Sequence, residues 1–182
     1  GKGSYANDIP VGQTKTEFTT AITGNKDTDK EYVDFGVLQK DGTYKFTQDT
    51  KIDVSKKSAL EVKNNLTINA SNNKLNLSST GKSGRPLSAL KYEPNKKDGI
   101  KNVTINAKEL NILVDNQKGR AEGIRFGGQG SGLADQRAKM TINGDLNINA
   151  SGNGYCLGIY TASNNQLDIN GNLTQNTPPA TP

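Results

Sequence analysis

Four short segments recur along the second half of the chain and constrain its fold more than any single residue. They are LTIN at 66, VTIN at 103, MTIN at 140 and LDIN at 167, so their starts lie 37, 37 and 27 residues apart. The apolar positions of each segment lie two residues apart, which is the period of a strand with one buried face. Strands of constant length joined by loops of variable length indicate a stacked array, in which each repeat buries its apolar face against its neighbours.

Two further alternating segments recur inside each repeat. The second follows the first closely, as in KLNLS and ELNIL, and the third is SALEV at 58, SALKY at 88, EGIRF at 122 and LGIYT at 157. YKFTQ at 44 is an earlier copy of the first segment, so the shortest repeat has 22 residues, from 44 to 65. Three short strands per turn, with equivalent strands stacked in parallel, predict an all-β fold: a right-handed parallel β-helix of about five coils.

The alternation also predicts which side chains face the interior. For the first strand they are Tyr44/Phe46, Leu66/Ile68, Val103/Ile105, Met140/Ile142 and Leu167/Ile169; for the second, Ile52/Val54, Leu75/Leu77, Leu110/Ile112, Leu146/Ile148 and Leu173; for the third, Leu60/Val62, Leu90/Tyr92, Ile124/Phe126 and Ile159/Thr161. We expect one domain with an N-terminal cap and first strands (1–43), coils at 44–65, 66–102, 103–139, 140–166 and 167–176, and a Pro/Thr-rich tail (177–182).

Asparagine closes the first strand of four repeats. Asn69, Asn106, Asn143 and Asn170 hold equivalent positions, so they predict an asparagine ladder at one corner of the stack. A second set, Asn76, Asn111 and Asn147, alternates with apolar residues and is expected to face outward.

The N-terminal segment has a different pattern. Phe18 and Ile22 are spaced i, i+4 within residues 14–24, and Gly24 follows, so we expect a short amphipathic helix there that covers the open end of the stack. Asp41-Gly42 lies between two apolar stretches and predicts a tight turn.

The residues offer little for catalysis or for binding a metal. The chain has no histidine, and Glu109, Asp115, Glu122 and Asp135 are scattered over different strands and loops. The run Asn25, Asp27, Asp29 and Glu31 resembles half of a calcium loop, but Lys30 stands where the loop needs glycine. We therefore expect no catalytic residue, metal or cofactor. The lone Cys156 aligns with Leu87 and Ala121, and we expect it to be a buried structural thiol.

Positive charge is the remaining functional signal. The net charge is +5, and basic residues concentrate in the long loops of the two 37-residue coils. We expect these loops to converge on one flank and to attract a polyanion, such as a sulfated or sialylated glycan, an acidic polymer or an acidic protein. The candidate ligand-binding residues are Lys82, Arg85, Lys96, Lys97, Arg120, Arg125 and Arg137, with Tyr160 as an aromatic platform. An ordinary solubilising surface is the alternative. Specific nucleic-acid binding is not expected, because few aromatic residues lie among these charges.

The runs LTINASNNKLNLSS and DGTYKFTQDTKIDV resemble the passenger domains of bacterial type V autotransporters, especially adhesins, over about residues 14–176. The resemblance implies a non-enzymatic adhesin fragment at the cell surface, tethered to the outer membrane by a C-terminal barrel outside this sequence. Its partners would be glycans or proteins of a host or bacterial surface, including copies of itself on other cells, and the fragment would not insert into a membrane. A structural stalk and a polysaccharide-processing β-helix enzyme remain the alternatives.

Overall fold

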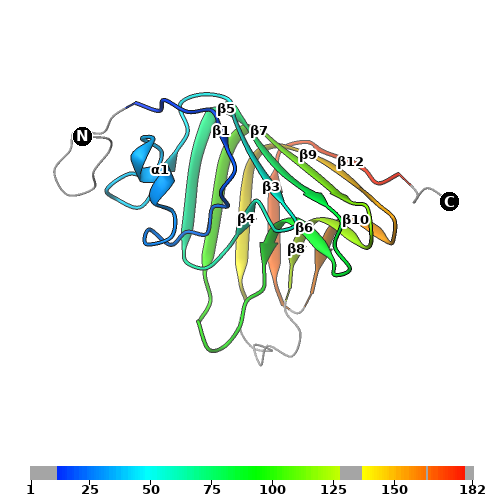
Figure 1. The fold of residues 1–182 in the computed structure, drawn as a ribbon. Helices are drawn as coiled ribbons and strands as arrows, with labels where there is room; N and C mark the ends of the chain where they lie inside the picture. The colour runs from blue at the N-terminus through cyan, green and yellow to red at the C-terminus, as the bar shows by residue number, and fades with distance from the viewer. Residues whose placement is uncertain (1–11, 128–136, 163, 179–182) are drawn as a thin grey trace.

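The computed structural model describes residues 12–127, 137–162 and 164–178, and it shows an all-β protein built from two parallel sheets (Figure 1). The strands are β1 (Glu17–Phe18), β2 (Tyr44–Lys45), β3 (Thr50–Ser55), β4 (Leu60–Glu61), β5 (Leu66–Gly81), β6 (Leu87–Tyr92), β7 (Asn102–Asn116), β8 (Ala121–Phe126), β9 (Lys139–Gly152), β10 (Cys156–Thr161), β11 (Gln166–Asn170) and β12 (Leu173–Asn176), and the helix is α1 (Lys30–Asp34).

The first sheet contains the LTIN, VTIN, MTIN and LDIN segments, and its register confirms their predicted stacking. The predicted register of the first coil in this sheet is wrong by two residues, because Tyr44 pairs with Ile68 rather than Leu66 and Ile52 pairs with Leu77 rather than Leu75. Its strand order is β1-β3-β5-β7-β9-β11, with β2 paired to β5 and β12 paired to β9. Ile68 lies opposite Ile105, which lies opposite Ile142, which lies opposite Ile169. The first three isoleucines are at most 1% exposed, and Ile169 is half-buried because its strand is the last in the sheet.

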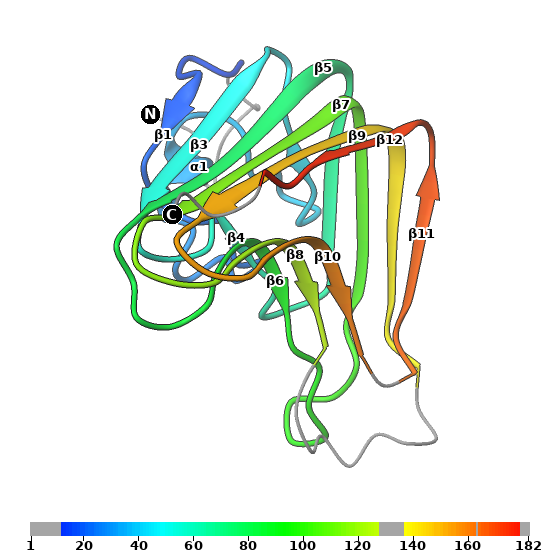
Figure 2. The ribbon, with the colours of Figure 1, turned by 90° about the vertical axis from the view of Figure 1, so that its right-hand side faces the viewer.

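In the three longest strands, the predicted first and second segments form one continuous strand that turns a corner (Figure 2). The corner is marked by a shift of register between Ala70 and Lys74 in β5 and between Asn106 and Glu109 in β7. Hydrogen bonding therefore continues around a bend where we expected two separate strands. The two segments are separate only at the ends of the sheet, as β2 and β3 and as β11 and β12.

The second sheet consists of the predicted third strands, in the order β10-β8-β6-β4. Leu60, Leu90, Ile124 and Ile159 lie in register, as the alignment of SALEV with its later copies predicts. The core lies between the two sheets and includes the stacked rings of Tyr92 and Phe126, whose centroids are 5.3 Å apart. The predicted inward orientation fails at Thr161 in β10 and at Leu173 in β12 of the first sheet, which are both exposed.

The helix predicted at 14–24 is wrong. Phe18 lies in β1 opposite Ile52 of the first sheet, and Ile22 forms a parallel bridge with Leu60 of the second sheet. Both side chains are fully buried, as expected, but this segment follows the path of the repeats and extends both sheets. An i, i+4 apolar pair suits a helix, and it suits equally a chain that turns from one sheet to the next.

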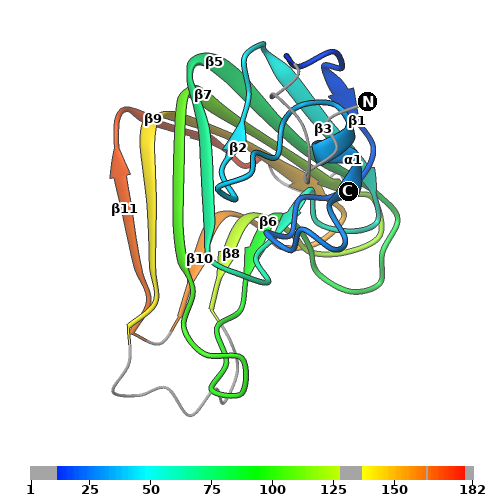
Figure 3. The same cartoon turned by 90° about the vertical axis from the view of Figure 1, so that its left-hand side faces the viewer.

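The helix of the N-terminal region is α1, which lies at one end of the molecule (Figure 3). Before it, the buried carboxylate of Asp29 accepts hydrogen bonds from Thr23 N, Thr23 Oγ1, Gly24 N, Thr28 Oγ1 and Tyr44 Oη. The ring of Tyr32, from α1, stacks on Phe18 at 4.6 Å. The predicted turn at Asp41-Gly42 is present, with Gly42 at φ +88° and an antiparallel bridge between Leu38 and Tyr44.

The asparagine ladder forms as predicted over its last three members. Asn143 Nδ2 donates to Asn106 Oδ1 at 2.7 Å, and Asn170 Nδ2 donates to Asn143 Oδ1 at 2.9 Å. A second ladder joins Asn76, Asn111 and Asn147 by bonds of 2.9 and 2.8 Å on the outer face of the same sheet. Within the described residues, no helix is long and apolar enough to cross a membrane.

Candidate ligand-binding surface

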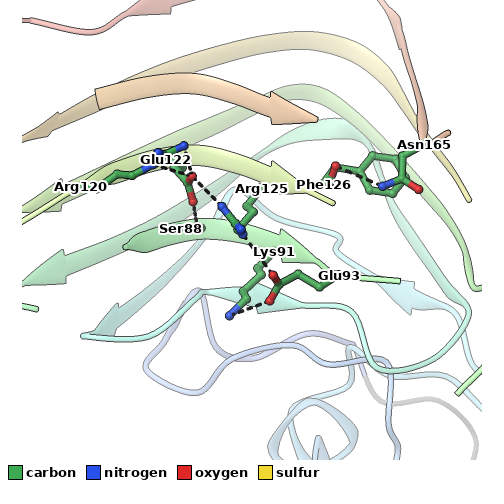
Figure 4. Close-up of polar contacts among 8 residues, drawn as sticks. All are labelled: Ser88, Lys91, Glu93, Arg120, Glu122, Arg125, Phe126 and Asn165. Carbon is green, nitrogen blue, oxygen red and sulfur yellow. Dashed lines mark hydrogen bonds and ion pairs between the residues drawn. The ribbon is translucent and has the colours of Figure 1, made fainter. Parts of the chain in front are cut away.

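The outer face of the second sheet carries the polar cluster with the most contacts to predicted site residues. In β8, a Cβ atom added to Gly123 would lie 2.4 Å from Ile148 Cγ2, so position 123 faces the interior. Ile124 is also buried, in the core. Glu122 and Arg125 flank this pair, and their side chains point toward each other (Figure 4).

Glu122 organises this cluster, although its side chain is fully buried. Its Oε1 accepts a hydrogen bond from Ser88 Oγ of β6 at 2.8 Å, and its Oε2 accepts bonds of 2.9 Å from Arg120 Nε and from Arg125 Nη1 (Figure 4). A buried carboxylate is stable only when its lone pairs are satisfied, and here two guanidinium groups and a hydroxyl satisfy them. The result is a fixed position for both arginines.

Arg125 also reaches Glu93, the residue that follows β6. Its Nε donates to Glu93 Oε2 at 3.2 Å, and Lys91 Nζ lies 3.2 Å from the other oxygen of the same carboxylate. Burial alone would lower the pKa of Arg125, but the nearby carboxylates of Glu122 and Glu93 raise it. The arginine therefore keeps its charge although only 15% of its side chain is exposed.

Two tyrosines lie against these arginines. The guanidinium carbon of Arg120 is 5.6 Å from the ring centre of Tyr155 and 5.5 Å from that of Tyr160, while that of Arg125 is 4.6 Å from Tyr160. Such distances are those of cation–π contacts. Tyr155 is 68% exposed. We call Arg120, Glu122, Arg125, Tyr155 and Tyr160 the Arg–Tyr patch.

The other candidate residues do not join this patch. Lys82 and Arg85 lie in the loop that enters the second sheet at β6, whereas Lys96 and Lys97 lie in the loop that leaves it. These two sets of loops lie at opposite ends of the second sheet (Figure 2), and a strand of six residues spans roughly 20 Å between them. The expected convergence of the basic loops on one flank is therefore wrong.

Arg137 belongs to the leaving end with Lys96 and Lys97, and its Nη1 donates to Gln166 Oε1 at 3.1 Å. Asp135, one of the acidic residues of the sequence, lies outside the described residues. A cavity of about 210 Å³ lies between the strand pair β4–β6 and the leaving loop. Its lining includes Lys91 and Glu93, so it adjoins Arg125 through the Glu93 carboxylate.

Four of the acidic residues that could serve metal or acid–base chemistry, Asp29, Glu31, Glu109 and Glu122, have other partners. Asp29 is surrounded by the donors described above, Glu31 forms an ion pair with Lys15, and Glu109 lies 3.5 Å from Lys74. Over the described parts of the chain, no cluster of three or more His, Cys, Asp or Glu residues is arranged to hold a metal ion.

Cys156 lies in register with Ala121, as the alignment predicts, and it is half-buried rather than fully buried. Burial raises the pKa of its thiol above the ordinary value.

Sequence reasoning missed Ser88, Glu93 and Tyr155 as parts of the surface. The alignment of the third strands contained one usable signal: it places Ser88 beside Glu122 and Lys91 beside Arg125. Tyr155 lies in a turn, where alternation gives no information. No family model matches the chain, and the comparisons with curated proteins and with solved structures found no match.

Proposed function

We propose that this chain is a right-handed parallel β-helix of about five coils, with three strands in each and a short helical cap at its N-terminal end. We further propose that it is a non-enzymatic, adhesin-like part of an autotransporter passenger that is displayed on the outside of a Gram-negative-type cell. The parallel register of equivalent residues supports the architecture. The resemblance of its repeats to such passengers supports the class.

The observation that carries a binding function is the Arg–Tyr patch. Glu122 uses one edge of each guanidinium group, and no hydrogen-bond partner within the described residues occupies Arg120 Nη1 or Arg125 Nη2. These N–H groups can bind a carboxylate, and planar guanidinium groups suit that ligand. The exposed ring of Tyr155 offers an apolar face beside them, against which a sugar ring can pack.

The charges around the patch favour a ligand with one carboxylate over a dense polyanion. Lys91, Arg120 and Arg125 contribute three positive charges, and Glu93 and Glu122 contribute two negative ones, so the local sum is +1. A glycan that ends in a carboxylated sugar, such as a sialylated glycan, matches this balance. The function we propose is attachment to such glycans on a host or bacterial surface.

Calorimetric titration with a sialylated oligosaccharide and with its desialylated counterpart tests this proposal. We expect binding of the sialylated form only, and about a fivefold or greater weakening by Tyr155→Ala, because an exposed aromatic contact is typically worth about 1 kcal/mol or more. The double variant Lys96→Gln/Lys97→Gln is the matched control, since these lysines lie at the other end of the sheet.

If the control variant weakens binding equally, the Arg–Tyr patch is rejected as the binding site. The basic residues of the long loops would then be the better candidates. Equal affinity for both oligosaccharides would reject the carboxylate as the recognised group. Cleavage of the bound oligosaccharide would replace the adhesin by an enzyme, and a chain that binds neither oligosaccharide would leave the structural stalk as the better interpretation.

A further inference from the structure

The turns that carry the chain from the first sheet to the second are stacked on one another along one edge of the molecule (Figure 2). They follow β3, β5, β7 and β9, and backbone hydrogen bonds join each to the next repeat. Lys56 N donates to Thr80 O at 2.9 Å, Gln117 N to Gly81 O at 2.9 Å, and Asn153 N to Asn116 O at 3.0 Å.

The stacking is tight because small residues and one buried amide hold the turns together. A Cβ atom on Gly119 would lie 2.9 Å from Ser83 O, and one on Gly152 would lie 2.6 Å from Asn116 O. The fully buried Asn116 accepts bonds from Ser83 N and Lys118 N and donates to the carbonyl oxygens of Arg85 and Arg120. The edge is therefore a rigid support for the side chains that project from it.

Those side chains are basic. The turns after β3, β5 and β7 carry five exposed cations, which we call the basic edge: Lys56, Lys57, Lys82, Arg85 and Lys118. None of the five forms an ion pair with any residue in the part of the chain that the structure describes. The half-buried carboxylate of Asp115 precedes the third turn in β7. Neighbouring strands lie about 4.8 Å apart, so the five charges are distributed over about 10 Å of the stack.

We propose that the basic edge binds a linear sulfated polysaccharide whose chain runs across the stacked turns, in the direction in which the strands stack. Closely spaced cations without counter-charges attract a polymer that carries an anion at short intervals. Four of the five cations are lysines, whose compact ammonium groups bind sulfate oxygens as point charges without demanding a planar partner.

The absence of stacking platforms on these turns favours a sugar polymer over a single-stranded nucleic acid. Proteins that hold single strands place aromatic rings among the basic residues, so that bases stack on them. Residues 56–59, 82–86 and 117–120 contain no aromatic side chain, and Tyr155 follows only in the fourth turn. The basic edge shares no residue with the Arg–Tyr patch, although Arg120 and Tyr155 of that patch lie in the third and fourth of the stacked turns, and it does not depend on the ligand of that patch.

A heparin-derived oligosaccharide is the probe, with titrations of the whole chain over a range of salt concentrations. The edge variant carries Lys57→Gln, Lys82→Gln and Lys118→Gln together with Lys56→Asn, because Lys56 has φ +59° and asparagine tolerates that conformation. The charge-matched control carries Lys30→Gln, Lys40→Gln, Lys45→Gln and Lys108→Gln at exposed sites away from the edge.

We expect the edge variant to bind the probe about tenfold more weakly or worse, with a shallower dependence of affinity on salt, while the control keeps most of the affinity. Both variants should melt within a few degrees of the parent, because every substituted side chain is exposed. A second edge variant, in which arginine replaces the same four lysines, keeps the positive charge and should still bind the probe. Its binding would show that substitution at these positions leaves the chain folded.

Equal losses in the edge variant and the control would overturn the proposal, because net charge alone would then explain binding. Binding of a thymidine oligonucleotide as tightly as the heparin fragment would also overturn it and assign the edge to nucleic acid. A parent chain that ignores both probes would reject the basic edge but not the Arg–Tyr patch, which the Tyr155→Ala titration tests separately.

Discussion

Gly123 of the second sheet faces Ile148 of the first so closely that a methyl group at position 123 would lie 2.4 Å from Ile148 Cγ2. The two sheets approach each other here with no room for a Cβ atom. Glu122 and Arg125 lie in the same strand as Gly123. The position of the Arg–Tyr patch therefore depends on this close approach of the two sheets.

Gly123→Ala should therefore destabilise the protein by about 1–3 kcal/mol, the usual cost of overpacking a dense core. Thermal unfolding followed by circular dichroism measures the loss. Gly84→Ala is the matched control, because a Cβ atom at position 84 would meet nothing within 4 Å. If the two variants have the same melting temperature, the two sheets are farther apart than the structure places them.

Ile142→Asp should destabilise the protein by about 3 kcal/mol or more. Ile142 is 1% exposed and lies between Ile105 and Ile169, so the carboxylate would be buried between strands without a partner. Urea unfolding gives the free energy, and Thr67→Asp, at an exposed position of the neighbouring repeat, provides the comparison. An unfolding midpoint like that of the parent would disprove the register assigned to β9.

Asp29→Ala should destabilise the N-terminal region by about 3 kcal/mol, because the change leaves buried donors, including Tyr44 Oη and Thr23 N, without their acceptor. Burial and the Asp29 charge raise the pKa of Tyr44, which shows how closely the two groups are coupled. Hydrogen exchange of residues 17–46 reports the effect locally. Asp27→Ala, at an exposed position, should leave exchange unchanged. Equal protection in both variants would show that Asp29 does not stabilise this region.

The ion pair of Lys15 and Glu31 predicts a specific acid sensitivity. Burial would raise the pKa of Glu31, but its bonds to Lys15 and Thr20 outweigh this and lower the pKa from the ordinary 4.5. A carboxyl whose folded pKa is lowered contributes stability that is present above the unfolded value and is lost as pH falls through the folded one.

Lys15→Met should thus cost stability at about pH 7 and much less at an acidic pH below the lowered pKa of Glu31, where this carboxyl is protonated in both states. Urea midpoints of the parent and the variant at the two pH values give this difference, and Lys26→Met, at an exposed position, controls for the lost charge. A difference that stays constant with pH would show that Lys15 acts only by packing over Phe18 and Phe35.

Alternation and repetition were enough to predict the stacked parallel strands and their register from Leu66 onward. They placed the first coil two residues out of register in the first sheet, because a shift of two residues keeps the same face of a strand buried. The isoleucine of LTIN, VTIN, MTIN and LDIN and the copies of SALEV fix which residues lie opposite one another, because one face of each strand must be buried. The corner within β5 and β7 was not predictable in this way, since continuous hydrogen bonding around a bend leaves the same apolar pattern as two strands. Phe18 and Ile22 misled for a related reason: their spacing suits both a helix and a chain that crosses between sheets.

The candidate surface was predictable only where strand register governs it. The register brings Arg125 beside Lys91 and Tyr160, so these neighbours follow from the alignment. The burial of Glu122 beneath two arginines depends on side-chain conformations, and Tyr155 reaches Arg120 from a turn. Neither is encoded in a period of two residues. The expected convergence of the basic loops failed because loops after the second and third strands leave from opposite ends of the second sheet.

The register has a mechanical consequence. Tyr44 pairs with Ile68, Ile68 with Ile105, Ile105 with Ile142 and Ile142 with Ile169, so each paired residue lies one repeat along the chain. Under tension applied to its two ends, the molecule would lose its outermost strands first and yield one repeat of chain at each rupture. The steps of extension would be unequal, because 37-residue repeats with long loops release more chain than the shorter ones. A force-extension trace would then display the order of loop lengths that the sequence contains.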